Sequence, residues 1–188
     1  MLEFFAESFL PTKFGDFKVV AFRDGKSEHI VLVKELLEDN IPVRIHSKCF
    51  TGDTLASLRC DCREQLEAAL MYISKNGGML IYLDQEGRGI GLGNKIKAYA
   101  LQDEGYDTVD ANKKLGFKDD HRNFDVAAEI LQYFGISKIQ LITNNPLKIK
   151  NLEKKGIVVE RIPLIISPNK YNKKYIETKK KKLKHLIE

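Results

Sequence analysis

The feature that most constrains this chain is the grouping of its only three cysteines, Cys49, Cys60 and Cys62, in one short stretch. The first residues, Met1–Phe5, include an early acid and no basic segment, which is a poor match to an export signal. In a reducing cytoplasm, an odd number of cysteines disfavours a disulfide framework. The grouping therefore favours metal binding or thiol chemistry.

The spacing of the cysteines, C-x10-C-x-C, bears on the kind of metal site. Structural zinc sites usually contain C-x2-4-C pairs and four protein ligands, whereas three ligands and an open position are typical of catalytic zinc. A water at the open position has its pKa lowered to about 7, so hydroxide is available at neutral pH. Two alternatives stay open: three buried free thiols, or a structural site completed by His46.

The composition is that of a globular protein. The 188 residues are 43% hydrophobic and 30% charged, and no apolar run approaches the roughly 18 residues that a membrane span needs. We expect a cytoplasmic protein with a single domain over residues 1–188. Its net charge of +5 is compatible with phosphorylated ligands or nucleic acid. Much of this charge lies in a tail of about residues 171–188, which we interpret as a solvated last helix or a frayed end.

The hydrophobic period changes along the chain. Alternating or apolar segments between turn residues predict strands in the first third, and apolar positions at helical spacing predict helices after it. The predicted strands are 16–22, 29–33, 42–46, 79–83, 138–143 and 157–162, and the predicted helices are 62–74, 94–104, 124–134 and 146–155. This order predicts the α/β class, bordering on α+β, with a mixed β-sheet flanked by helices.

A glycine-rich turn, Gly87–Gly93, joins a predicted strand to a predicted helix. Backbone N–H groups and the helix dipole at such a turn bind anions. Its glycines do not fit G-x-G-x-x-G, and no G-x-x-x-x-G-K-[ST] is present, so a dinucleotide fingerprint and a P-loop are excluded. Glu86 and Arg88 are candidate ligand contacts; the alternative is an ordinary turn with solvated charges.

Two more polar segments lie beside predicted helices. Asp119–Arg122 precedes the helix 124–134, where its acids either cap the helix, as Asn123 also would, or act on a ligand. Thr143–Lys148 ends a strand and opens a helix at Pro146, and it either binds phosphate or forms an ordinary Asn-Pro turn. Together with the cysteines, these segments suit a phosphorylated substrate attacked by a metal-bound water.

In this combination the sequence resembles GTP cyclohydrolase II. The resemblance runs from about Leu10 to His185 and keeps the order of the family's motifs. The motifs are Arg44–Asp53, Leu58–Cys62, Gln85–Leu92, Ala98–Asp103, Gly105–Thr108, Leu115–Phe117 and Leu141–Pro146. Because few residues precede the match, we expect the single-function form of the family, without the synthase domain that some members carry in front.

The resemblance implies a reaction, cofactors and partners. GTP is expected to give formate, pyrophosphate and 2,5-diamino-6-ribosylamino-4(3H)-pyrimidinone 5′-phosphate, the first step of riboflavin biosynthesis. The family implies Zn2+, Mg2+ with the substrate polyphosphate, and a homodimer. We expect no nucleic acid and no membrane as partners.

The resemblance also implies the site residues. Cys49, Cys60 and Cys62 would bind zinc, and the catalytic residues would be Asp120 as proton acceptor, Arg122 as nucleophile at the α-phosphate, and Tyr99. The implied GTP-binding residues are Arg44, Ile45, His46, Ser47, Lys48, Gln65, Glu86, Gly87, Arg88, Thr108, Thr143 and Lys148.

Physical chemistry supports most of these roles. Gln65 follows Cys62 by three residues on one helix face, so its amide would meet the base while zinc faces C8. Lys148 and Arg88 would neutralise phosphate charge. A guanidinium stays protonated at any working pH, so Arg122 suits a clamp on the phosphate better than a nucleophile unless Asp120 removes a proton.

Three positions depart from the family pattern: Lys48 where Glu is usual, Gly93 where an aliphatic residue is common, and Arg63 where Gly is frequent. These departures bear on affinity and local geometry. One alternative function is a hydrolase of another purine nucleotide. Another is a non-catalytic zinc module that binds nucleic acid through the basic tail, which would need a fourth zinc ligand and aromatic residues interleaved with the lysines.

Overall fold

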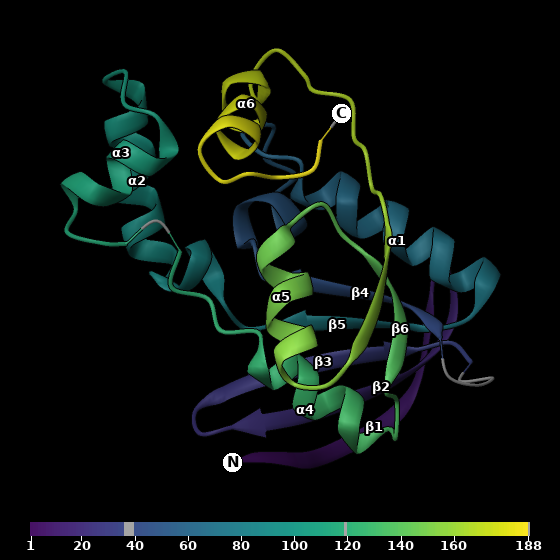
Figure 1. The fold of residues 1–188 in the computed structure, drawn as a ribbon. Helices are drawn as coiled ribbons and strands as arrows, with labels where there is room; N and C mark the ends of the chain where they lie inside the picture. Colours follow the sequence, from purple (N-terminus) through teal and green to yellow (C-terminus); the bar gives the residue numbers. More distant parts are fainter. Residues whose placement is uncertain (36–39, 119, 188) are drawn as a thin grey trace.

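The computed structural model describes residues 1–35, 40–118 and 120–187. Within them, seven strands form one mixed sheet in the order β1-β2-β3-β5-β4-β6-β7 (Figure 1). The pairs from β1 through β3 to β5 are antiparallel, and those joining β5, β4, β6 and β7 are parallel. The strands are β1 (Leu2–Thr12), β2 (Gly15–Asp24), β3 (Ser27–Val33), β4 (Ile41–Ser47), β5 (Met79–Leu83), β6 (Lys138–Ile142) and β7 (Val158–Ile162).

Both faces of the sheet are covered. In β5, Met79, Ile81 and Leu83 join the hydrophobic cluster on one face, whereas Leu80 and Tyr82 belong to the cluster on the other. This alternation follows from the two-residue period of a strand. A central strand buried on both faces is nearly apolar throughout, which is why its sequence is a continuous apolar run.

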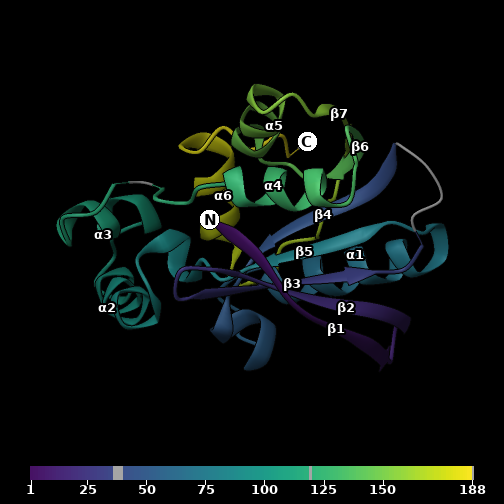
Figure 2. The same ribbon diagram turned by 90° about the horizontal axis from the view of Figure 1, so that it is seen from below.

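The two clusters are closed by different helices. Helix α1 (Cys62–Asn76) packs Ala69, Leu70 and Ile73 on one face. Helices α4 (Asp125–Tyr133) and α5 (Pro146–Lys154) cover the other face, and Figure 2 shows both above the sheet. Among the described residues, no helix combines the length and apolar character that a membrane crossing requires.

Strands β4 and β6 are parallel neighbours, but the connections that follow them lead to strands on opposite sides of the pair. From β4 the chain passes through α1 to β5 on one side, and from β6 it passes through α5 to β7 on the other. In open α/β sheets, such a reversal opens a crevice at the carboxyl ends of the strands, where ligands bind. The fold therefore places a binding site beyond Ser47 and Ile142.

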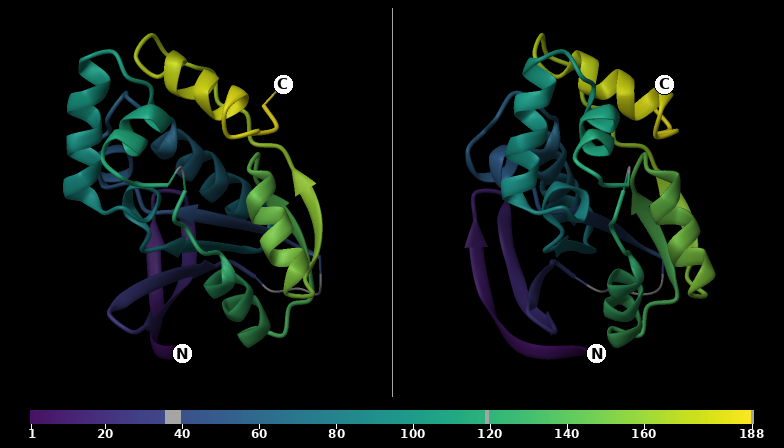
Figure 3. Two further views of the ribbon diagram at one scale, coloured as in Figure 1. Left: turned by 60° about the vertical axis from the view of Figure 1, so that its left-hand side comes forward. Right: turned by 90° about the vertical axis from the view of Figure 1, so that its left-hand side faces the viewer.

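Three helices stand beyond this edge of the sheet, as the two views in Figure 3 show. They are α2 (Leu92–Asp103), α3 (Thr108–Lys114) and α6 (Lys173–Lys181). Two short helical turns, η1 (Phe50–Thr54) and η2 (Glu86–Gly89), follow β4 and β5. The crevice is thus enclosed by segments from several parts of the chain.

The predicted mixed α/β sheet is confirmed, and each predicted strand and helix is present within a few residues of its expected ends. Besides the short turns η1 and η2, two elements were not predicted. Strand β1 is an edge strand with exposed side chains along most of its length, so it lacks an alternating pattern. Helix α3 is short, and its start depends on the Asp107 cap rather than on apolar spacing.

Gly78 allows β4 and β5 to approach closely at their start. Its φ is +109°, and a Cβ there would lie 2.1 Å from the Pro42 carbonyl oxygen. Gly78→Ala is therefore expected to lower the free energy of unfolding by roughly 2 kcal/mol or more. The control is Gly25→Ala, whose φ is +58° but whose Cβ would meet nothing within 4 Å. Denaturant unfolding of both variants measures the difference, and equal losses would contradict the steric argument.

Candidate active site

Three thiols meet at the start of α1. Cys49 follows β4, while Cys60 and Cys62 lie at the amino end of the helix, and their three sulfur atoms are within 4.8 Å of one another. The Cys49 and Cys60 Sγ atoms are 3.7 Å apart. A tetrahedral zinc ion with Zn–S bonds of about 2.3 Å holds its sulfurs roughly 3.8 Å apart. The cluster therefore has the donor type and the spacing that zinc requires.

Gly52 in η1 leaves room for this cluster. A Cβ at Gly52 would lie 2.8 Å from the Cys60 Sγ and 3.1 Å from the Cys49 Sγ. Contacts that short are not tolerated between Cβ and sulfur, so only glycine lets the loop wrap around the thiols. The loop is shaped by the need to enclose three sulfur atoms.

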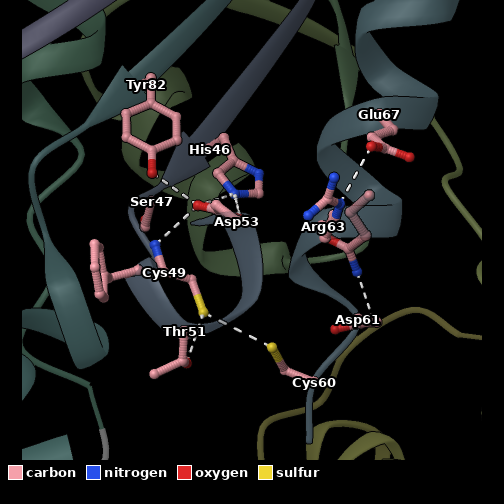
Figure 4. A network of polar contacts seen from close by, with 12 residues as sticks. His46, Ser47, Cys49, Thr51, Asp53, Cys60, Asp61, Arg63, Glu67 and Tyr82 are labelled. Carbon is pink, nitrogen blue, oxygen red and sulfur yellow. Dashed lines mark hydrogen bonds and ion pairs between the residues drawn. The ribbon is translucent and has the colours of Figure 1, made fainter. Parts of the chain in front are cut away.

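Asp53 holds this loop against the sheet, as Figure 4 shows. Its carboxylate accepts hydrogen bonds from the Cys49 backbone N–H at 2.9 Å and the Tyr82 hydroxyl at 2.8 Å, and it lies 3.2 Å from the His46 Nε2. The other ring nitrogen of His46 faces Arg44 at 3.5 Å. His46 is therefore directed away from the sulfur cluster, and among the described residues the cluster contains cysteines alone.

A buried ion pair lies against the thiols. The Lys95 ammonium donates to the Cys49 Sγ at 3.0 Å and to Glu86 Oε1 at 2.8 Å. Glu86 also accepts from the backbone N–H groups of Phe50 and Gly87. Hydrogen bonds from Cys60 and from Cys62, followed by Lys95, lower the pKa of Cys49 despite its burial. Glu86 thus joins the loop that carries Cys49, through Oε2, to Lys95, through Oε1.

Gln65 of α1 faces the same pocket between two charged partners. Its Oε1 accepts from the Arg44 guanidinium at 2.6 Å, and its Nε2 donates to Asp61 at 2.6 Å. Arg44 is buried and also donates to the Ile142 carbonyl at 3.0 Å. Burial lowers the pKa of Arg44 to about 10, although the negative charge of Asp61 acts to raise it. The guanidinium therefore stays charged at neutral pH. This arrangement holds the amide of Gln65 in one orientation.

The loop before α4 carries a second charged pair. The Arg122 guanidinium donates to Asp120 through Nε at 2.9 Å and through Nη2 at 2.6 Å, while its Nη1 reaches the Ser47 Oγ at 3.4 Å. Neither Asp120 nor Asn123 is the N-cap of α4: that position is Phe124, which makes no side-chain cap, and Asn123, one residue before it, accepts from the Asp125 N–H. Asp119, which was a second candidate cap, lies outside the described residues. Arg122 lines the pocket, and its guanidinium is held there by the Asp120 carboxylate.

Several cations also line the pocket. Arg88 has a left-handed backbone, with φ of +61°, and its buried Nη1 has no hydrogen-bond partner among the described residues. The Lys148 ammonium donates to the Ile45 carbonyl at 2.6 Å. Burial, with the charges of Arg44 and Arg122, lowers the pKa of Lys148 well below its ordinary value. An anion in this pocket would relieve that unfavourable charge density.

The remaining predicted residues have different positions. Tyr99 lies beside the thiols, with its hydroxyl 3.2 Å from the Thr51 Oγ1. Thr108 and Thr143 line the pocket. The side chain of Ile45, however, belongs to the hydrophobic core, so this residue offers a ligand no side-chain contact.

Lys48 also lines the pocket, but its ammonium pairs with Asp84 at 3.0 Å. The two side chains are 40% and 36% exposed. The Lys48 side chain is therefore neither buried in the site nor fully solvated. Water largely screens an exposed ion pair of this kind.

The C-terminal lysine run contributes to the pocket, which the sequence did not predict. Tyr175, Lys179 and His185 line it, and Lys179 is only 8% exposed. Our interpretation of the tail as solvated holds for Lys180 and Lys181 but is wrong for Lys179. In a run of lysines, no periodicity marks the one that turns inward. Lys95 was missed for a similar reason, since it is a single lysine on an amphipathic helix.

Comparisons with known proteins give a consistent result. A family model described as GTP cyclohydrolase II matches residues 3–163. GTP cyclohydrolase-2 of Campylobacter hominis is 52% identical over 95% of this chain and 92% of its own length. The Picrophilus torridus protein of the same name is 51% identical over the full length of both chains. Riboflavin biosynthesis protein RibBA of Thermotoga maritima is 57% identical over 97% of this chain and 48% of its own length.

The Asp120–Arg122 pair gives a pH-dependent prediction. Burial alone would raise the pKa of the Asp120 carboxyl, but the hydrogen bonds and charge of Arg122 outweigh it and hold the pKa below its usual value. The pair therefore stabilises the fold above the pKa of an unfolded Asp and loses its contribution as pH falls through the lowered value. Asp120→Asn is expected to reduce the free energy of unfolding by about 1–3 kcal/mol near neutral pH.

Thermal unfolding between pH 3 and 7 measures this effect, and the gap between wild type and variant should narrow below about pH 4. Asp103→Asn is the matched control, because Asp103 is 65% exposed and pairs with Arg59 at the surface. Its effect should stay within about 0.5 kcal/mol at every pH. A gap for Asp120→Asn that does not change with pH would rule out the ion pair as its cause.

Proposed function

Because this chain belongs to the GTP cyclohydrolase II family, we propose that it hydrolyses GTP to formate, pyrophosphate and 2,5-diamino-6-ribosylamino-4(3H)-pyrimidinone 5′-phosphate. This reaction is the first step of riboflavin biosynthesis. The observation that carries the proposal is that three clustered thiols and several buried cations line one pocket. The thiols suit a metal-assisted attack on the base, and the cations suit a polyphosphate.

The base is proposed to lie between Gln65 and the thiol cluster. The Gln65 amide is held by Arg44 and Asp61, so it presents a fixed donor and acceptor to the purine edge. Cys62 is on the same helix as Gln65, within one turn, so binding the purine edge at Gln65 directs the imidazole ring toward the sulfur atoms. Tyr99 closes this end, with its hydroxyl next to the thiol loop.

The triphosphate is proposed to lie against the cations of the pocket. Arg122, Arg88 and Lys148 line it, and each bears charge or donors suited to phosphate oxygens. The role that we propose for Arg122 is to hold the α-phosphate as negative charge develops on it, with Asp120 fixing the orientation of the planar guanidinium. Asp120 is close enough to accept a proton from Arg122 through the same hydrogen bonds.

We propose that Cys49, Cys60 and Cys62 hold one Zn2+, since their spacing suits it and His46 is engaged elsewhere. When bound, zinc activates water for attack at neutral pH. Lys95, by donating to Cys49, stabilises the thiolate form that metal binding requires. Mg2+ is proposed to accompany the polyphosphate, as is usual for nucleotide substrates.

The direct test is turnover. Purified protein supplied with GTP, Zn2+ and Mg2+ is expected to release formate and pyrophosphate in equal amounts, measured by coupled assays for each product. ATP in place of GTP should release neither product at a comparable rate. Release of pyrophosphate without formate, or of neither, would reject the full reaction, and equal turnover of ATP would favour the alternative of a hydrolase for another purine nucleotide.

Cys60→Ser tests the metal. The variant is expected to lose most of the zinc that metal analysis finds in the wild type, about one ion per chain, because serine is a poor ligand for zinc. Formate release should fall with zinc content. Thr54→Ser, an exposed conservative change in the same loop, is the control and should keep its zinc. Full zinc retention by Cys60→Ser would refute the assigned ligand set.

A further inference from the structure

Helix α6 reaches back to the metal-binding segment of the chain. The Lys179 ammonium donates to Asp61 Oδ1 at 2.5 Å, and the two side chains are 10% and 5% exposed. Just before the helix, the buried Asn172 donates to the Cys60 carbonyl at 3.3 Å. Asp61 lies between two of the clustered cysteines, so α6 is tied directly to that segment.

Asp61 passes this contact on to Gln65. One carboxylate oxygen of Asp61 accepts from Lys179 and the other accepts from the Gln65 Nε2 at 2.6 Å. The Gln65 Oε1 in turn accepts from Arg44 at 2.6 Å. An unbroken chain of charge-assisted hydrogen bonds therefore joins the C-terminal helix to the sheet through the amide of Gln65.

The chemistry of the partners fixes which way the amide of Gln65 points. An ionised carboxylate only accepts hydrogen bonds, so Asp61 must face the NH2 end; a guanidinium only donates, so Arg44 must face the oxygen. A rotation by 180° would place donor against donor and acceptor against acceptor. What remains for a ligand is one N–H and one oxygen lone pair in a fixed order.

That order distinguishes guanine from adenine. Guanine carries an acceptor at O6 where adenine carries a donor at N6, and the neighbouring N1 is protonated in guanine but bare in adenine. An amide in one orientation matches guanine, and the reversed amide matches adenine. Control of the amide orientation is therefore control of which purine is accepted.

We propose that Lys179 is a positioning residue for base selection, which acts through Asp61 to fix the orientation of the Gln65 amide toward the purine. This inference rests on the proposed function, because it takes the purine of GTP as the group that Gln65 meets. Without the ammonium, the buried Asp61 carboxylate loses the cation that holds it in place, so it is free to turn away from Gln65.

Two other lysines of the C-terminal run stand outside this chain of hydrogen bonds, so they provide matched controls. Lys182 pairs with Asp107 at 2.5 Å and with Asp110 at 3.0 Å. Lys181 pairs with Glu177 on the helix surface and is 77% exposed. Lys182→Met removes an attachment of α6, and Lys181→Met removes a charge from the same helix, but neither change touches Asp61.

The experiment measures binding of the α,β-methylene analogues of GTP and ATP to the zinc-loaded protein by calorimetry. In Lys179→Met, the preference for the GTP analogue over the ATP analogue is expected to fall about tenfold, the effect of losing one well-made hydrogen bond to a buried group. Zinc content is expected to stay at the wild-type level. Lys179→Arg should restore most of the preference, since it restores a cation beside Asp61.

The controls separate orientation from attachment. Lys182→Met should lower the thermal midpoint but keep the preference, and Lys181→Met should change neither. If Lys179→Met does not fold, Lys179→Gln is measured instead with the same expectation, because it removes the charge but keeps a polar side chain. An unchanged preference in the folded Lys179 variant overturns the proposal, as does an equal loss of preference in Lys182→Met.

Measuring GTP turnover beside binding distinguishes failure of the Lys179 proposal from failure of the proposed reaction. If the wild type prefers the GTP analogue but releases no formate from GTP, the proposed reaction fails while the role of Lys179 is still measured. If the wild type turns over GTP and the Lys179 variant keeps its base preference, the positioning role fails and the reaction stands.

Discussion

The burial of polar side chains on strand β4 is the constraint on which the rest of the site depends. Because side chains alternate along a strand, Val43 and Ile45 enter the core beneath α4, while Arg44 and His46 point to the face covered by α1. Two polar groups buried at the centre of a sheet must find partners. Gln65 and Asp53 meet that requirement, and in doing so they fix helix α1 and the loop that carries Cys49.

The sequence predicted those parts of the fold that depend on local periodicity. The apolar runs of the central strands, the proline that opens α5, and the glycine that ends α1 each leave a local signal. Strand β1 leaves none, since a partly solvated edge strand needs no alternation. Strand order also escaped prediction, because it is decided by the packing of α1 and α4 on opposite faces.

In the site, too, residues with a local sequence signal were predicted, and residues placed by long-range packing were not. The cysteine spacing and the turn at Gly87 are local, and the structure brings their residues together. The partners that orient the site residues come from distant segments. Asp53 accepts a hydrogen bond from Tyr82, and Asp61 accepts one from Lys179. Each of these partners is a common residue type, with nothing in its neighbourhood that distinguishes it from solvated counterparts. Functional groups were therefore predictable, while most of the residues that hold them in place were not.

The contact between α6 and Asp61 also has a consequence for the chain entropy of folding. The Cys49–Cys60 contact spans 11 positions along the chain, whereas the Lys179–Asp61 contact spans 118. Closing the longer loop costs more chain entropy and depends on a sheet that is already formed. The attachment of α6 to Asp61 therefore rests on a far longer loop closure than the contact between the thiols does.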